Sequence, residues 1–202
     1  GTAYSIAIGD FNGDGNRREI AVGEDGDIFV FNSSCQQLWT SNSPTGIVFD
    51  IASGNLTDDA GDEIAIADNG SITTDGGLIV YNSSGAVKWN ASGFYSQSVE
   101  IGIIDSTTGS DIAVNNASGE VRAYNGSGSS LWNYRGITGS VYEIRFGNFS
   151  SKGIIAFTDE GSDAVIVVNG SGIQTWNYSL PGASANYYSL AVGDLDNDNL
   201  DD

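Results

Sequence analysis

Residues Gly9–Gly23 read GDFNGDGNRREIAVG, and a related stretch, GDLDNDNLDD, occupies Gly193–Asp202. In both, oxygen-bearing side chains stand at every second position directly after a short apolar segment. An exposed turn requires polar residues, but it does not require this alternation. The spacing therefore indicates a function for the loop, and the apolar segment beside it belongs to a longer pattern.

That pattern is an internal repeat. Short apolar segments that end in Asp or Asn recur at spacings of about 43–50 residues, which is a period typical of repeat architectures. The segments are SIAIGD, DIASGN, EIGIID, EIRFGN and SLAVGD, and they end at Asp10, Asn55, Asp105, Asn148 and Asp194.

Each of the first four units continues with three more short segments rich in Val, Ile, Phe and Tyr, which favours strands. The fourth segment ends in a tryptophan seven residues after a turn asparagine, and all four tryptophans of the chain share this register. We therefore expect each tryptophan on an outer strand, packed between neighbouring units. The tryptophans are Trp39, Trp89, Trp132 and Trp176.

Four antiparallel strands per unit predict an all-β fold, a β-propeller of four-stranded blades, with about four blades plus the start of a fifth. We expect one repeat domain over residues 1–202 that is a fragment of a longer chain, because the sequence stops inside a motif. The expected blades span approximately 1–45, 46–95, 96–138, 139–182 and 183–202.

The first and last loops predict Ca²⁺ sites. A curled loop with oxygens at alternate positions can supply the six to eight ligands, at about 2.3–2.6 Å, that Ca²⁺ prefers, and Mg²⁺ suits such a flexible cage less well. The first loop offers side chains of Asp10, Asn12, Asp14 and Glu19 and the carbonyl of Asn16. The last offers Asp194, Asp196, Asp198 and Asp202 and the carbonyl of Leu200.

The other loops depart from this pattern. In the first loop an extra residue puts Arg18 at the ninth position, so Glu19 must reach in from one place later. The second loop predicts a weaker site from Asn55, Thr57, Asp59, Gly61 and Glu63. The third loop, from Asp105, lacks the middle carboxylate, and the fourth places Lys152 at a ligand position, so we expect both to be metal-free turns.

The blade pattern with DFNGDG and DLDNDNLDD between its first two strands resembles the FG-GAP repeats of the integrin alpha-subunit propeller and its microbial relatives. The half of each unit that runs from the turn asparagine to the tryptophan also resembles quinoprotein-type propeller blades. The resemblance covers essentially the whole chain. It implies calcium that stiffens the blades, and it does not imply catalysis.

Ten asparagines stand in Asn-x-Ser/Thr sequences, the acceptor pattern for N-linked glycans. Asn-Gly also suits a hairpin turn by itself, so a turn role is the alternative at Asn125 and Asn169. Glycosylation would place the protein outside the cell, and the composition favours an archaeal surface protein. Asn55 and Asn148 begin possible metal loops and suit a glycan less well. The other candidate acceptors are Asn32, Asn69, Asn82, Asn90, Asn116, Asn125, Asn169 and Asn177.

Composition limits the function. The net charge of −19 repels nucleic acid and anionic lipid, and no run of about 18 apolar residues exists, so we expect neither nucleic-acid binding nor membrane insertion. The 202-residue chain has no His and one cysteine, Cys35, in an expected turn, and we expect no enzyme.

We instead expect a non-catalytic, structural or adhesive cell-surface protein that binds a surface or matrix protein, a glycan or itself, including assembly into a fibre. Two alternatives are an integrin-head-like ligand-binding propeller, for which Tyr95, Tyr134, Tyr187 and Tyr188 are candidate contacts, and an accessory module of a polysaccharide-degrading enzyme.

Overall fold

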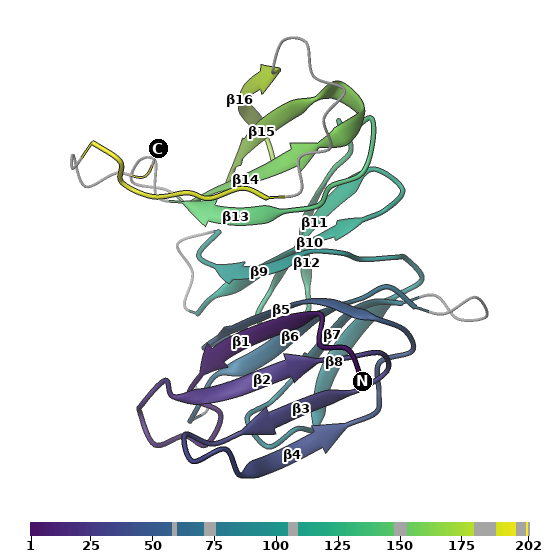
Figure 1. The fold of residues 1–202 in the computed structure, drawn as a ribbon. Coiled ribbons are helices and arrows are strands. Elements are labelled where there is room, and N and C mark those ends of the chain that lie inside the picture. Colours follow the sequence, from purple (N-terminus) through teal and green to yellow (C-terminus); the bar gives the residue numbers. More distant parts are fainter. Residues whose placement is uncertain are drawn as a thin grey trace.

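The computed structural model describes residues 1–57, 60–70, 76–104, 109–147, 153–179, 189–196 and 201. In these residues sixteen strands form four antiparallel sheets, each of four strands joined in sequence order, which confirms the predicted β-propeller fold (Figure 1). The first sheet contains β1 (Ser5–Gly9), β2 (Glu19–Gly23), β3 (Ile28–Phe31) and β4 (Gln37–Ser41). The second contains β5 (Val48–Gly54), β6 (Glu63–Asp68), β7 (Gly77–Tyr81) and β8 (Val87–Ser92). The third contains β9 (Val99–Gly102), β10 (Asp111–Asn116), β11 (Glu120–Asn125) and β12 (Ser130–Tyr134). The fourth contains β13 (Ile144–Gly147), β14 (Ile154–Asp159), β15 (Ala164–Asn169) and β16 (Gln174–Ser179), and a 3-10 turn, Glu160–Ser162, lies between β14 and β15.

The sheets follow one another as blades, from the purple N-terminal sheet to the green fourth sheet in Figure 1. Each interface between neighbouring blades holds its own cluster of buried apolar side chains. The second strands β6, β10 and β14 are buried along their whole length, because each lies inside a blade that has a neighbour on its faces. This burial explains why these strands read as continuous apolar runs rather than as an alternating pattern.

The tryptophans of the first three blades join each blade to the next, as the sequence predicts. The indole Nε1–H of Trp39 donates to the carbonyl of Ser83 at 3.0 Å. Trp89 and Trp132 donate in the same way to the carbonyls of Gly126 and Gly170, at 3.1 and 3.0 Å. In each of these three contacts the indole of one blade donates to a backbone carbonyl of the blade that follows it in the chain.

A glycine lies under each of these indole rings. A Cβ atom placed on Gly85, Gly128 or Gly172 would lie 2.7 Å from Cδ2 of the indole above it, closer than two carbon atoms can approach. All three glycines also have positive φ, between 71° and 87°. The corresponding position in blade 1 holds Cys35, with φ 59°, so blade 1 presents a side chain where the other turns present open backbone.

A β-bulge precedes each tryptophan. In all four blades the pairing of the third and fourth strands shifts by one residue, which leaves the residue before the tryptophan unpaired. Bulges redirect the side chain they carry. The four bulge residues are Leu38, Lys88, Leu131 and Thr175.

The expected first strand of a fifth blade is not a strand in the structure. Residues 189–194 have no strand pairing, although Leu190 and Val192 pack against Ile154, Ala156 and Val167 of blade 4. In the other blades the first strand is held by hydrogen bonds to the second. The described part of the chain provides no second strand for this unit, so the segment is held through its side chains.

Candidate metal centre

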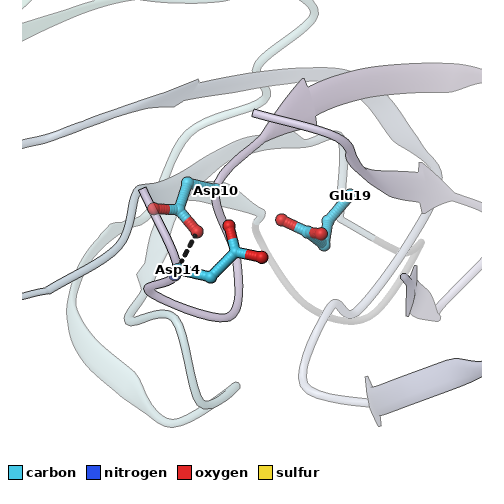
Figure 2. A group of neighbouring side chains, drawn as sticks. All are labelled: Asp10, Asp14 and Glu19. Atoms are coloured by element: carbon cyan, nitrogen blue, oxygen red, sulfur yellow. Dashed lines mark hydrogen bonds between the residues drawn. The ribbon is translucent and has the colours of Figure 1, made fainter. Parts of the chain in front are cut away.

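The loop between β1 and β2 brings three carboxylates together. Asp10, Asp14 and Glu19 each offer an oxygen atom, and these oxygens lie within 4.8 Å of one another. Figure 2 shows the three side chains converging from the end of β1, the turn and the start of β2. Asp10 and Glu19 are buried and Asp14 is exposed, so the group opens to solvent on one side.

Backbone hydrogen bonds fold the loop around Asp10. One oxygen of its carboxylate accepts from the N–H groups of Gly13 and Asp14 at 2.8 and 3.0 Å, and the other accepts from Gly15 at 2.8 Å. Gly13 and Gly15 have φ values of 74° and 82°, which a residue with a side chain adopts at a cost. These contacts explain the glycines and the first aspartate as parts of an Asx turn.

The same contacts do not explain Glu19. Its side chain is 1% exposed, and its Oε2 atom is buried without a hydrogen-bond partner. Its Oε1 atom accepts one bond from the Asn12 amide at 3.3 Å. An unpartnered buried carboxylate oxygen costs about 1–3 kcal/mol or more, and a cation at this point would supply the missing partner.

The donor set fits a hard cation. The ligand atoms are oxygens, and no thiol or imidazole takes part, which is the chemistry of Ca²⁺ rather than of a transition metal. The Arg18 guanidinium lies 3.2 Å from Asp14, but both side chains are largely exposed and their ion pair is weak. A hydrogen bond from the Asn16 side chain is the main cause that lowers the pKa of the Asp14 carboxyl, so this carboxylate stays charged.

The structure places the other predicted ligands of this loop close by. Glu19, and not Arg18, joins the carboxylate group, as expected from the extra residue. The Asn12 Oδ1 atom accepts from the Asp14 N–H at 2.9 Å. The carbonyl of Asn16, a predicted ligand, accepts from the Arg18 N–H at 3.1 Å.

The carboxylate loop also contacts the next blade. The Asp10 N–H donates to the Asp62 carboxylate at 2.9 Å, and the Asp62 N–H donates to the Asp10 carbonyl at 2.7 Å. Arg17 lies 3.3 Å from Asp62 and donates to the carbonyl of Ser53 in β5. A cation held by this loop would therefore stiffen both blade 1 and its contact with blade 2.

The second loop is different. Glu63 begins β6 as Glu19 begins β2, but both of its oxygens have partners: Leu56 N–H at 2.8 Å, the Thr57 hydroxyl at 2.8 Å and the Lys88 ammonium at 3.0 Å. The carbonyl of Asn55, the first predicted ligand, accepts from the Ser110 N–H of blade 3. Asp59 lies outside the described residues, and Gly61 has φ 96° in the turn.

The last predicted site is described only in part. Asp194 and Asp196 belong to the described residues, whereas Asp198, Leu200 and Asp202 lie outside them. Asp105 and Lys152, on which the predictions for the third and fourth loops rest, lie outside them too.

The recurring turn asparagines have a structural role that the sequence left open. The Oδ1 atoms of Asn82 and Asn125 each accept two backbone N–H groups, from residues two and four places later. Asn32 and Asn169 do the same in their blades. These bonds use Oδ1, whereas a glycan attaches to Nδ2, so the turn role and the acceptor role are chemically compatible.

Among the other acceptor candidates, Asn116 does not suit a glycan. Asn116 is only 6% exposed, because the second strand of blade 3 is covered on both faces. Its Oδ1 atom accepts from the Ser118 N–H. Asn90 in β8 and Asn177 in β16 are exposed, and Asn69 is partly exposed. Asn148 lies outside the described residues.

Two of the four tyrosines suggested as ligand contacts, Tyr95 and Tyr134, belong to the described residues. Tyr95 is 43% exposed. Tyr134 donates to Gln174 of blade 4 and packs with its ring centroid 5.4 Å from that of Phe157, so it belongs to a blade interface. Tyr187 and Tyr188 lie outside the described residues.

Buried polar residues at the ends of the second strands form a set that was not predicted from the sequence. Asp68 accepts from the backbone of Thr45 and Gly46, and Asp159 accepts from that of Thr138 and Gly139. In blade 3 Asn115 holds the corresponding segment through Gln97 and Ser98. Each fastens the segment that enters its own blade, which is a structural role.

A further polar cluster lies on and beside the first strands of blades 2 to 4. Arg145 lies 3.0 Å from Glu100 and also contacts Glu143. Burial raises the pKa of Glu100 to about 7, against the lowering effect of Arg145. Burial likewise raises the pKa values of Asp50 and Glu143.

Comparison with known proteins supports the fold and nothing finer. No protein-family model matches the chain, and no curated protein sequence matches it. Similar solved structures include BBS1N in complex with ARL6DN, soaked with lead (TM-score 0.60, 15% identity) and soaked with mercury (TM-score 0.61, 14% identity). Each comparison covers 81% of this chain and 50% of that chain, so the sequence spans about half the length of these structures. The chain is thus similar to a β-propeller protein.

No helix in the described residues has the length and apolar character needed to cross a membrane.

Proposed function

We propose that this chain is a non-catalytic, calcium-stabilised β-propeller that acts as an extracellular scaffold and binds a protein. The supporting observation is the buried Oε2 atom of Glu19, which has no hydrogen-bond partner and lies beside Asp10 and Asp14. The loop that holds these three residues is hydrogen-bonded to the next blade. The FG-GAP resemblance of the first and last loops supports the same role. Asp194, Asp196, Asp198, Leu200 and Asp202 are proposed ligands of a second calcium ion.

Calcium would act here as a structural ion. The loop carboxylates repel one another without it, and a divalent cation would offset this repulsion and satisfy Glu19. Because the Asp10 backbone and Arg17 also hold Asp62, the ordering of the loop would pass to blade 2. The proposed benefit is rigidity of a repeat protein whose blades each contact only their neighbours.

Calorimetric titration and thermal unfolding test this proposal. Saturating Ca²⁺ at about 100 times its Kd should raise the Tm by about 5–10 °C relative to excess chelator, because only the folded loop binds the ion. The Glu19→Gln variant should lose one bound ion. Without calcium it should melt at or above the native temperature, since the amide removes the repulsion from Asp10 and Asp14.

Asp25→Asn is the control, because Asp25 is exposed and lies outside the loop. It should keep the native calcium response. An unchanged Tm in chelator and calcium, or a Glu19→Gln variant with the native ion count, would contradict the proposal.

The second part of the proposed function is protein binding. The similar structures contain BBS1N in complex with ARL6DN, which supports a propeller surface used for protein recognition. The extracellular, glycosylated setting is proposed from the Asn-x-Ser/Thr sequences. Peptide mass spectrometry of the native protein should find glycans at the exposed Asn90 or Asn177, but none at the buried Asn116.

A further inference from the structure

The β5–β6 loop of blade 2 is the counterpart of the carboxylate loop of blade 1, yet its buried glutamate is fully satisfied. Glu19 and Glu63 both begin the second strand of their blade, and both are 1% exposed. Glu19 has an oxygen without a partner, whereas both oxygens of Glu63 are bonded. Two contacts make the difference: the Leu56 N–H donates to Oε2 of Glu63, and a cation lies at its Oε1, where Glu19 has the Asn12 amide.

The cation is the ammonium group of Lys88. Its Nζ atom lies 3.0 Å from Oε1 of Glu63 and 2.9 Å from the hydroxyl of Thr57. The Lys88 side chain is 21% exposed, so the ammonium lies within the loop rather than on the open surface. It contacts two oxygens that the sequence pattern assigned to a metal ion.

The bulge before the tryptophan explains how the ammonium reaches this point. In β8 the register passes from Val80↔Trp89 to Tyr81↔Val87, and Lys88 is the unpaired residue between them. Its side chain crosses from the outer strand to the start of β6. The bulge residues of the other blades, Leu38, Leu131 and Thr175, carry no charge and cannot do this.

We propose that the ammonium group of Lys88 is the resident cation of the blade 2 loop, in place of a divalent ion. The weaker site predicted from Asn55, Thr57, Asp59, Gly61 and Glu63 then binds no calcium in the native chain. The buried carboxylate at the start of the second strand is thus neutralised by the proposed calcium ion in blade 1 and by a lysine side chain in blade 2.

A double-mutant cycle in excess chelator tests the pairing without any reference to calcium. Lys88→Met and Glu63→Gln should each lower the Tm by several degrees, because each breaks the ion pair between two largely buried groups. The double variant should be distinctly more stable than the sum of the two losses allows. Leu131→Met, at the equivalent bulge of blade 3, should leave the Tm nearly unchanged; additive losses in the cycle would overturn the proposal.

Calcium titration tests the second half of the inference. Glu63→Gln should bind the same number of calcium ions as the native chain, whereas Lys88→Met should recover more of its Tm in millimolar calcium than the native chain gains. A Glu63→Gln variant that loses one bound ion would overturn the proposal. If the native chain binds no calcium at all, the proposed function fails, but the cycle in chelator still decides the role of Lys88.

Discussion

The buried acid at the start of the second strand has different partners in different blades. Glu19 and Glu63 have the same position and the same burial, but a leucine precedes the tryptophan in blade 1 and a lysine precedes it in blade 2. Blade 3 uses the shorter Asp111, which accepts from the Ile104 N–H at 2.8 Å. The second strand of blade 4 begins with Ile154 and has no acid there.

Glu100 gives a prediction at this scale. Its pKa in the folded protein, about 7, lies above the ordinary value of 4.5, because burial outweighs the attraction of Arg145. The folded state therefore holds the proton more tightly than the unfolded state, so this group stabilises the protein below about pH 4.5 and loses that effect as the pH rises through 7. The raised pKa values of Asp50 and Glu143 act in the same direction.

We expect Glu100→Gln to flatten this part of the pH profile. Between pH 4.5 and 7.5 the free energy of unfolding of the native chain should fall by about 1–2 kcal/mol more than that of the variant. Urea unfolding at four pH values in this range measures the difference. Parallel profiles for the two proteins would contradict the assigned pKa shift, and the exposed Asp25→Asn serves as the control.

At the scale of elements, the tryptophan joint is the part that the sequence predicts best. The fixed spacing from the turn asparagine indicated an inter-blade role, and Trp39, Trp89 and Trp132 have that role. The glycine beneath each indole was not predicted, since glycine is common in any turn of this sequence. Its steric need becomes evident only when the neighbouring blade is in place.

Gly128→Ala tests the joint. The new Cβ atom would meet the Trp89 ring at 2.7 Å, and φ of 87° already disfavours alanine, so we expect a loss of about 2–4 kcal/mol in unfolding free energy. Gly93→Ala has a similar φ of 90° with no neighbour within 4 Å, and it should lose only about 1–2 kcal/mol. Equal losses in the two variants would show that the indole contact adds nothing.

The remaining polar contacts could not be predicted, for a physical reason. Asp68, Asn115 and Asp159 bond to segments 17 to 23 residues away, and the strand ends that carry them look like any polar turn. Lys88 reaches Glu63 across 25 residues and only because a bulge turns it inward. The periodic pattern specifies strands and their order, but it does not specify which side chains meet across a blade.

At the scale of the whole molecule, the described blades form a row in which apolar clusters join neighbours only. Stability in such an arrangement is close to a sum of blade and interface contributions. The loop between β1 and β2, where the first ion is proposed to bind, lies at one end of the row and fastens blade 1 to blade 2 (Figure 1). The effect of this ion should therefore be local.

Hydrogen exchange with mass spectrometry measures this locality. Transfer from calcium to chelator should speed exchange in β1–β4 several-fold and leave β9–β12 unchanged, because the contacts of the loop described above are with blade 2. The same transfer with Glu19→Gln should produce little change in β1–β4. A uniform acceleration across all four blades would indicate a cooperative unit instead.

The side chain of Cys35 has a consequence for how a further tryptophan could dock on blade 1. Trp176 of blade 4 is 52% exposed and has the register of a donor, but the turn of blade 1 carries a Cβ atom where every occupied acceptor has none. An indole that docks on the turn of blade 1 would therefore have to approach it differently from Trp39, Trp89 and Trp132.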